Sequence, residues 1–245
     1  MKILVCITHV PDTTSKINFI NNQTKFDTTG VQFIIGPYDD YALARAVELK
    51  EASGATVTVL NVGLVETEPT LRKALAIGAD DAIRVNAEPV DSFFVARQIA
   101  EHARSQHYDL ILMGRESIDY NSGIVHALVG ELLGIPSVSP VMKLDLNGNQ
   151  ATLAREIEGG KELVEVNLPF VAGCQEPIAE WKIPNMRGIM SARTKPLKVV
   201  EPVAVESAVK LEKYELPPPK GAVKLVPADN VKALVDLLKN EARIL

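Results

Sequence analysis

The residues best suited to bind a small molecule lie between 114 and 123, in a polar segment that follows an apolar run. The segment ends in small residues, which would let the N-terminus of a following helix approach a phosphate, and Ser122 can donate a hydrogen bond from its hydroxyl. The sequence has no Gly-x-Gly-x-x-Gly after its first apolar run and no Walker lysine motif. The segment therefore predicts either a ligand-binding loop outside these two standard types or a helix-capping turn without a ligand.

Side-chain catalysis finds little support in the residue pattern. The four histidines, His9, His102, His107 and His126, do not have the spacing of metal ligands. There is no Gly-x-Ser-x-Gly elbow and no Cys/His pairing. The carboxylate pairs at 39–40 and 80–81 are better explained by helix capping and a turn than by acid/base chemistry. We therefore expect no catalytic side chain and no metal site, and predict a binding protein or a reaction carried by a cofactor.

A basic segment stands apart from the rest of a chain whose formal net charge is −5. No acidic residue occurs between Lys182 and Val200, where the cations are Lys182, Arg187, Arg193, Lys195 and Lys198. Apolar residues alternate with the first of these cations between Ile183 and Met190. This composition favours a protein docking loop, because charge steers the encounter and Met adapts its shape to a partner. An ordinary solvated loop is the alternative.

An α/β domain is the scaffold that would position these residues. Buried strands are predicted at 3–7, 56–60, 82–85 and 110–113, where the runs are short and rich in Val, Ile and Leu. Amphipathic helices are predicted between them, starting at Asp39 or Asp40, at Thr67, at Asp91 and near Ser122. This repetition predicts a parallel sheet covered by helices on both faces. Ligands bind such sheets at the carboxyl ends of the strands, which here selects the loops 6–12, 36–39, 62–63 and 114–123.

The pattern changes after residue 137. Strand-like segments at 138–146, 151–158, 162–167 and 170–175 are joined by Asn147-Gly148 and Gly159-Gly160, which predicts a hairpin extension of the sheet. From Pro184 onward we expect compactness to fade, since six of the fifteen prolines lie between Pro196 and Pro227. A last amphipathic helix carries Val231, Leu234, Val235 and Leu238 on one face. We expect this arm to dock on a partner subunit, with a flexible tail as the alternative.

Composition sets the outer limits. The chain has 245 residues, of which 47% are hydrophobic and 23% charged, so it is long enough for one sizeable domain with an appendage and too apolar for wholesale disorder. The negative net charge argues against a dedicated nucleic-acid binder, and no apolar run reaches the ~20 residues of a membrane span. Cys6 and Cys174 are far apart in apolar stretches, which predicts buried reduced thiols. With no signal peptide visible, we expect a cytoplasmic or organelle-matrix protein.

Six blocks of sequence carry a resemblance to a known family. They are Val-Pro-Asp-Thr at 10–13, Gly-Pro-Tyr-Asp-Asp-Tyr-Ala at 36–42, Leu-Arg-Lys-Ala-Leu-Ala-Ile-Gly-Ala-Asp at 71–80, Gly-Arg-Glu-Ser-Ile-Asp at 114–119, Arg-Glu-Ile-Glu-Gly-Gly at 155–160 and Arg-Gly-Ile-Met-Ser-Ala-Arg at 187–193. In this order, and over nearly the whole chain, they resemble the β subunit of electron transfer flavoproteins. The last block is the most specific.

The resemblance implies a Rossmann-like three-layer fold with a parallel sheet, of the adenine nucleotide hydrolase-like type, with an antiparallel hairpin extension and an extended C-terminal arm. Residues 1–185 would form the nucleotide-binding domain, and residues 186–245 the end of a recognition loop and an arm packed on an α subunit. The family's heterodimer shares one FAD between its subunits and holds a structural AMP. It carries electrons from acyl-CoA and related dehydrogenases to a quinone oxidoreductase, and is a carrier rather than an enzyme, without nucleic-acid partners or membrane insertion.

Carried over by position, the resemblance assigns three groups of residues. The expected AMP contacts are Cys6, Gly36, Pro37, Tyr38, Asp39, Val62, Gly114, Arg115, Glu116, Ser117, Ile118, Asp119, Tyr120, Asn121, Ser122, Gly123, Ile124 and Val125. Thr13 and Tyr38 would lie near the flavin. The recognition loop would comprise Lys182, Ile183, Pro184, Asn185, Met186, Arg187, Gly188, Ile189, Met190 and Ser191, with Met186 as its apolar anchor.

Two departures from the family pattern bear on the nucleotide. Gly123-Ile124-Val125 stands where many relatives have Asn-Gln-Thr or Ala-Gln-Val, and Gly36 stands where Asn is common. Two alternatives stay open: an electron-bifurcating relative with a second FAD in place of AMP, and a stand-alone nucleotide-binding module of the universal-stress type. The expected location is the cytoplasm of a bacterium, or the mitochondrial matrix of a eukaryote.

Overall fold

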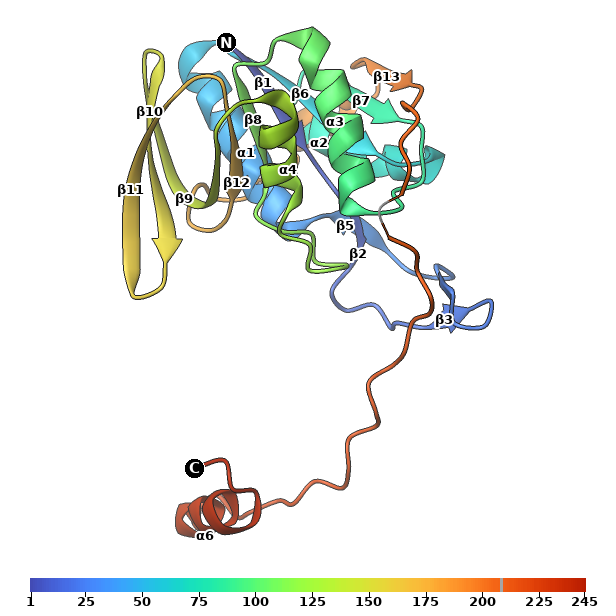
Figure 1. Ribbon diagram of the computed structural model, residues 1–245, viewed down its shortest axis with the longest axis vertical. Helices are drawn as coiled ribbons and strands as arrows, with labels where there is room; N and C mark the ends of the chain where they lie inside the picture. The colour runs from blue at the N-terminus through green and yellow to red at the C-terminus, as the bar shows by residue number, and fades with distance from the viewer. Residues whose placement is uncertain (208) are drawn as a thin grey trace. The chain divides into compact units, whose positions relative to one another are not determined.

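The short apolar runs form the centre of a sheet in the computed structural model, which describes residues 1–207 and 209–245 (Figure 1). Within these residues the sheet has nine strands. In spatial order they are β11 (Gly160–Asn167), β10 (Gln150–Ile157), β9 (Ser137–Asn147), β12 (Phe170–Cys174), β8 (Leu110–Gly114), β1 (Lys2–Cys6), β6 (Thr56–Val62), β7 (Asp81–Val85) and β13 (Leu197–Val200). Pairing is parallel from β9 to β13 and antiparallel along β9, β10 and β11. The predicted parallel sheet with a hairpin extension is confirmed.

Helices cover both faces of this sheet. Successive side chains of a strand point to opposite faces, so Ile3 and Val5 of β1 pack in one apolar cluster and Leu4 in another. The first cluster includes residues of α1 (Pro37–Ser53) and α2 (Glu68–Ile77), and the second includes residues of α3 (Ser92–Gln106) and α4 (Val125–Leu133). The result is the predicted three-layer α/β fold.

The predicted helix starts are only partly right. Asp91 caps α3 as expected, with its side chain accepting a hydrogen bond from the Phe94 amide at 2.6 Å. The predicted cap at Asp39 or Asp40 is wrong, because α1 begins at Pro37 and Gly36 is its N-cap residue. Thr67 precedes α2, but its hydroxyl donates to the Leu64 carbonyl in a 3-10 turn, η1 (Val65–Thr67).

The chain stays ordered well past Pro184, where we expected compactness to fade. Helix α5 (Met186–Ala192) packs on α2, and β13 then extends the parallel sheet beside β7. Beyond β13, the buried Gln98 of α3 holds the backbone of Val203 with two hydrogen bonds, of 2.8 and 2.9 Å. The expectation failed because these elements are specified by distant contacts rather than by local pattern.

The described residues divide into two units. The larger one comprises Met1–Asn18 and Asp27–Leu211, and it also contains a small sheet of β2 (His9–Pro11) and β5 (Phe33–Ile35). The smaller unit comprises Phe19–Phe26 and Glu212–Leu245. No helix in the described residues has the length and apolar content needed to cross a membrane.

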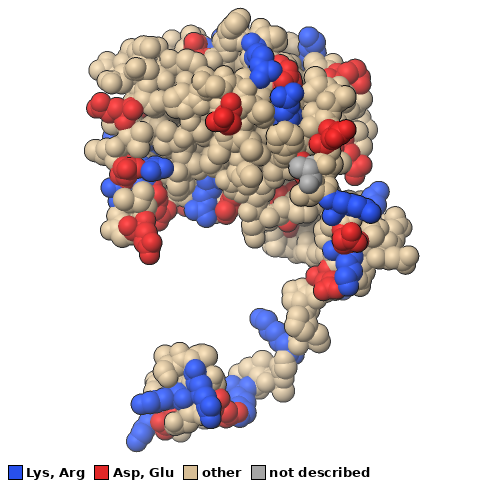
Figure 2. All heavy atoms as spheres, in the orientation of Figure 1, with Lys and Arg blue, Asp and Glu red and all other residues tan. Residues whose placement is uncertain are grey.

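The smaller unit contains a hairpin of β3 (Phe19–Ile20) and β4 (Lys25–Phe26). The Tyr214 ring stacks on Phe19, with ring centroids 4.6 Å apart. Helix α6 (Val231–Asp236), which continues as a π-helical turn η2 (Leu237–Glu241), has no buried residue. Figure 2 shows Lys and Arg side chains on the surface of this C-terminal helix. The helix predicted from the sequence is present, and its apolar side chains Val231, Leu234 and Val235 are exposed.

The position of Phe170 at the start of a central strand gives a test of the core. Phe170 is fully buried, so Phe170→Ala should lower the free energy of unfolding by about 3–5 kcal/mol through lost contacts and a cavity. Leu163→Ala, on the exposed side of β11, should change it by less than about 0.5 kcal/mol. Urea denaturation of the purified chain measures both. Equal midpoints for the two variants would contradict a core centred on β12.

Candidate functional site

The order of the strands creates a switch point beside β1. From β1 the chain proceeds to β6 and β7 on one side, with α1 and α2 on one face of the sheet. It then returns through α3, on the opposite face, to β8 on the other side of β1. The carboxyl ends of β1 and β8 are where ligands bind in sheets of this type. Two of the four predicted loops, 6–12 and 114–123, begin there.

Asp39 joins the two strand ends. One carboxylate oxygen, Oδ2, accepts hydrogen bonds from the backbone amide and the hydroxyl of Thr8, at 2.8 and 2.6 Å. The other, Oδ1, accepts from the Gly114 amide at 2.7 Å. Burial raises the pKa of Asp39 to about 6, against the opposing effect of the hydrogen bonds from Thr8 and Gly114. This single side chain therefore fixes the loops after β1 and β8 relative to the first turn of α1.

Two glycines make room for this arrangement. A Cβ atom at Gly36 would lie 2.3 Å from the Thr8 hydroxyl and 2.5 Å from Asp39 Oδ2. A Cβ atom at Gly114 would lie 2.7 Å from both Asp39 Oδ1 and the Tyr38 Cβ. No larger residue fits at either position without displacing the carboxylate. In this chain, the space at position 36 is filled by the side chains of Thr8 and Asp39, which gives a physical reason for Gly there.

Arg115, the residue after β8, is held from several sides. Its guanidinium lies over the Tyr38 ring, 4.9 Å from the ring centroid, and Nη1 donates to Gln175 Oε1 at 2.7 Å. Gln175 in turn donates from Nε2 to Glu156 Oε2 at 2.6 Å. Gln175 and Glu156, which hold Arg115 in place, were not predicted from the sequence. The only signal was the block at 155–160, which contains Glu156 but does not indicate its partner.

The predicted ligand loop folds back on itself before α4. The Ser117 amide donates to the Ser122 carbonyl at 3.1 Å, and the Asp119 carboxylate accepts from the Ser117 hydroxyl and the Tyr120 amide. The Ser122 hydroxyl is 2.6 Å from the Ser92 hydroxyl, so it has a protein partner already. Helix α4 begins at Val125, three residues later than predicted, because this turn precedes it.

The first turn of α4 has the features of an anion site. Its N-cap residue, Ile124, makes no side-chain capping hydrogen bond, and the turn contains no acidic residue. The backbone amides at a helix start are donors that need partners, and they favour a negative group. A phosphate is the kind of group that such a set of backbone donors suits, without a polar side chain at 123–125.

The remaining predicted contacts fall into different environments. Cys6 and Val62 are buried in the apolar cluster under α3 and α4, and burial raises the pKa of the Cys6 thiol. Both cysteines are free and buried, as expected. Thr13 is exposed on the turn after β2, and its place near a flavin stays a prediction. Among the described residues, no group of three or more His, Cys, Asp and Glu side chains is arranged to hold a metal ion.

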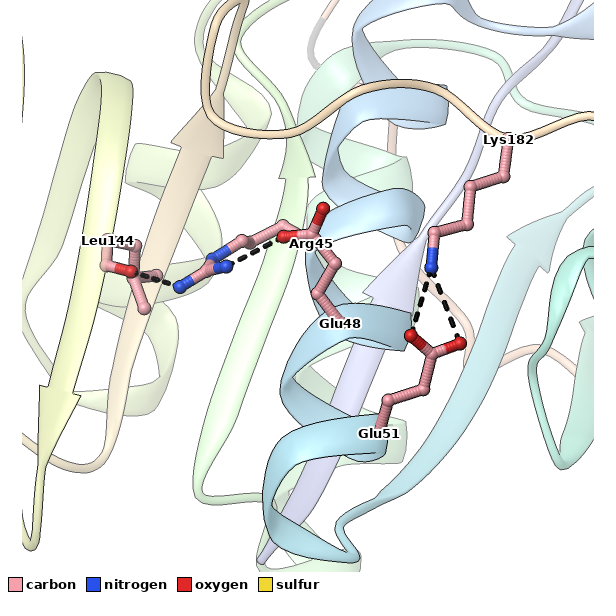
Figure 3. A network of polar contacts seen from close by, with 5 residues as sticks. All are labelled: Arg45, Glu48, Glu51, Leu144 and Lys182. Carbon is pink, nitrogen blue, oxygen red and sulfur yellow. Dashed lines mark hydrogen bonds and ion pairs between the residues drawn. The ribbon is translucent and has the colours of Figure 1, made fainter.

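The predicted recognition loop contains helix α5 rather than being a loop throughout. Asn185 caps the helix, and its side chain accepts from the Gly188 amide at 2.8 Å. At the start of the segment, Lys182 Nζ lies 3.2 and 3.4 Å from the two carboxylate oxygens of Glu51 on α1 (Figure 3). Ile183 and Met186 are about three-quarters exposed. Helix α5 and the residues just before it therefore carry exposed apolar side chains.

Two of the five cations of this segment serve the fold. Lys182 pairs with Glu51, and Lys195 Nζ donates to the carbonyls of Leu75 and Ala79 at 2.8 and 2.6 Å. The predicted steering charge is therefore smaller than the count of cations indicates. Arg187, Arg193 and Lys198 remain the candidates for that role, and all three are exposed.

Asp40 gives a test of the electrostatics beside the site. Its Oδ2 lies 3.9 Å from Lys73 Nζ, and burial raises its pKa from 3.8 to about 6 despite this lysine. The folded state therefore holds the proton more tightly than the unfolded state, so stability from this group is lost as the pH rises from about 4 to 6. Asp40→Asn should raise the free energy of unfolding at pH 7 by about 2 kcal/mol and leave it unchanged at pH 4.

Urea denaturation across this pH range measures the effect. Asp145→Asn, at an exposed position on β9, is the control and should leave the pH profile as in the parent. If Asp40→Asn instead lowered the free energy of unfolding at pH 7, burial would not make the Asp40 charge unfavourable, and the prediction would be wrong.

Comparison with known proteins identifies the family of this chain. The family described as "Electron transfer flavoprotein domain" matches residues 23–205. The chain is 36% identical to an electron transfer flavoprotein subunit beta of Bacillus subtilis, with all of both chains covered. It is 35% identical to the subunit of that name from Syntrophomonas wolfei, covering all of this chain and 98% of the relative. A mitochondrial subunit beta of Oryza sativa subsp. indica is 31% identical, again over both whole chains. The chain belongs to the electron transfer flavoprotein β-subunit family.

Proposed function

We propose that this chain is the β subunit of a heterodimeric electron carrier. In this proposal it pairs with an α subunit, helps to hold an FAD shared with that subunit, and receives electrons from acyl-CoA and related dehydrogenases for delivery to a quinone oxidoreductase. The observation that supports it best is the combination, in one chain of this family, of strand ends joined by Asp39 at the switch point with a helix, α5, whose Met186 is exposed. When bound, the flavin supplies the redox chemistry, and the chain has the role of a carrier rather than an enzyme.

For the nucleotide we propose AMP, held at the switch point. The first-turn amides of α4 would receive the phosphate, and the backbone between Gly114 and Gly123 would follow the ribose and phosphate. Gly36 and Gly114 let Asp39 hold the two strand ends in place, so these residues shape the cradle. Tyr38 and Arg115 would form one wall, and the buried side chains of Cys6 and Val62 the apolar floor. Thr13 and Tyr38 would lie toward the shared flavin.

For the partner contacts we propose two surfaces. Residues 1–185 would hold the nucleotide, and residues 186–245, which include the sheet strand β13, would supply the end of the recognition segment and the arm on the α subunit. The exposed apolar side chains of α6, Val231, Leu234 and Val235, are what such packing would cover. Since relatives occur in bacteria and in mitochondria, we propose the cytoplasm, or the mitochondrial matrix in a eukaryote.

The ligands released from the co-expressed α and β chains test the nucleotide assignment. We expect one FAD and one AMP for each heterodimer, by mass spectrometry and the flavin spectrum. Gly114→Ala should lower the AMP retained through purification about tenfold or more, because its Cβ would collide with Asp39 and Tyr38. Gly160→Ala, at the start of β11 and outside the proposed site, is the matched control and should retain AMP, since its Cβ would meet no atom within 4 Å.

Other ligand contents would change the proposal. Two FAD and no AMP for each heterodimer would replace it with the electron-bifurcating alternative. A stable heterodimer without flavin would overturn the carrier function, and a chain that binds nucleotide but no α partner would favour the stand-alone module.

Met186→Ala tests the docking surface. Met186 is 74% exposed at the start of α5, so its loss should slow reduction of the flavin by a dehydrogenase about tenfold without loss of bound flavin. Leu163→Ala, which removes a side chain of equal exposure on the edge strand β11, is the control and should leave the rate unchanged. Stopped-flow reduction of the heterodimer measures both. Equal rates for Met186→Ala and the parent would remove this surface from the proposal.

A further inference from the structure

Helices α2 and α5 are joined through their C-terminal carbonyl groups. The last carbonyls of any helix lack partners within it and attract cations. Arg72 of α2 donates from Nη1 to the carbonyls of Ala192 and Lys195, at 2.8 and 2.7 Å, at the end of α5. In the opposite direction, Lys195 donates to the carbonyls of Leu75 and Ala79 at the end of α2. Each helix thus receives a cation that belongs to the other segment.

Small residues on α5 set the distance between the two helices. Gly188 and Ala192 are four residues apart and share one face of the helix. A Cβ atom at Gly188 would lie 2.2 Å from the Ala76 carbonyl oxygen of α2, so the backbones are in direct contact there. Ala192 is buried in the core cluster. Met186 and Met190, also four residues apart, lie on a different face and are 74% and 58% exposed.

A groove of about 520 Å³ borders the contact between the two helices, and its lining includes Pro69, Arg72 and Ala76 of α2 and Ile189 and Ala192 of α5. Apolar packing along this contact is therefore incomplete. Because α5 has only seven residues, the hydrogen bonds of Arg72 and Lys195 and the close approach at Gly188 are the contacts that fix its direction.

We propose that Arg72 and Lys195 are positioning residues for partner recognition, which hold α5 so that Met186 and Met190 face the dehydrogenase. This inference rests on the proposed function. It also gives a role to residues 71–80, one of the six blocks of family resemblance, which contribute no residue to the proposed nucleotide site. Docking to a preformed helix avoids the entropic cost of ordering it in the complex. The contacts of Arg72 and Lys195 act on recognition through α5 and need no contact with the partner.

Arg72→Met tests the inference, because methionine has an unbranched side chain of similar length but cannot donate the two hydrogen bonds to α5. In the assembled heterodimer it should raise the apparent KM for the carrier in a dehydrogenase assay about five- to tenfold and leave kcat nearly unchanged. Lys195→Met should do the same, and Gly188→Ala should do so by forcing α5 away from Ala76. Flavin content and reduction by dithionite should match the parent. Hydrogen exchange of the α5 amides should become faster in all three variants.

The control is Arg45→Met. Arg45 of α1 donates to the Leu144 carbonyl at 2.6 Å, far along the chain from α5, and its removal should lower stability without changing the KM (Figure 3). A lowered melting temperature with an unchanged KM in Arg72→Met would show a role in stability alone and overturn the inference.

A double-mutant cycle separates this inference from the proposed function. If Arg72 acts through the position of Met186, the effects of Arg72→Met and Met186→Ala on KM should be less than additive. Fully additive effects, or no effect of Arg72→Met where Met186→Ala has one, would overturn the positioning role and leave the docking surface standing. No effect of Met186→Ala would instead overturn the docking surface itself, and with it the role of Arg72.

Discussion

The buried carboxylate of Asp39 is the contact on which the arrangement of the candidate site depends. A charged group in the core is costly unless donors surround it, and here three donors converge on it from the loops after β1 and β8. On β1, the pairing with β8 runs from Ile3 to Val5. Beyond that pairing, Asp39 joins the two chain segments from the first turn of α1. The position of Asp39 also explains why glycine occupies positions 36 and 114, since any side chain there would occupy the place of the carboxylate or its partners.

A similar arrangement, in which a charged side chain binds backbone groups of a distant segment, occurs where α2 and α5 meet. Polar groups that secondary structure leaves unsatisfied, amides in one case and helix-end carbonyls in the other, are paired with a charged side chain from a distant segment. Asp39 uses amide donors to join two loops, whereas Arg72 and Lys195 use carbonyl acceptors to join two helices. Both arrangements hold backbone rather than side chains in place. Each lies next to a surface for which we propose a binding role, the switch point in one case and the face of α5 that carries Met186 and Met190 in the other.

Much of the architecture could be predicted from the sequence, because hydrophobic period and turn residues are local signals. The four central strands, the hairpin at Asn147-Gly148 and the cap at Asp91 were predicted on that basis. Asp39 was wrongly predicted to be an N-cap residue, because an acidic residue just before a helical pattern is typical of a helix cap. Its true partners, Thr8 and Gly114, are 31 and 75 residues away. Likewise, the segment of α5 was predicted as a loop from its alternating basic and apolar residues, whereas contacts with α2 determine that it is a helix. Lys195 was assigned to steering because a sequence does not distinguish a solvated cation from one bound to carbonyls.

Strand β13 has a mechanical consequence for the chain that follows it. A force that pulls on the C-terminal residues reaches the two hydrogen bonds between Gln98 and Val203 before it reaches the ladder between β13 and β7. Where the pull runs along the strand, that ladder is loaded in shear, so several hydrogen bonds resist it together. Only after they yield would the strain pass through residues 194–196 to α5. A pull on the chain beyond Val203 therefore leaves α5 in position until β13 detaches, because β13 lies between α5 and the C-terminal arm in the chain.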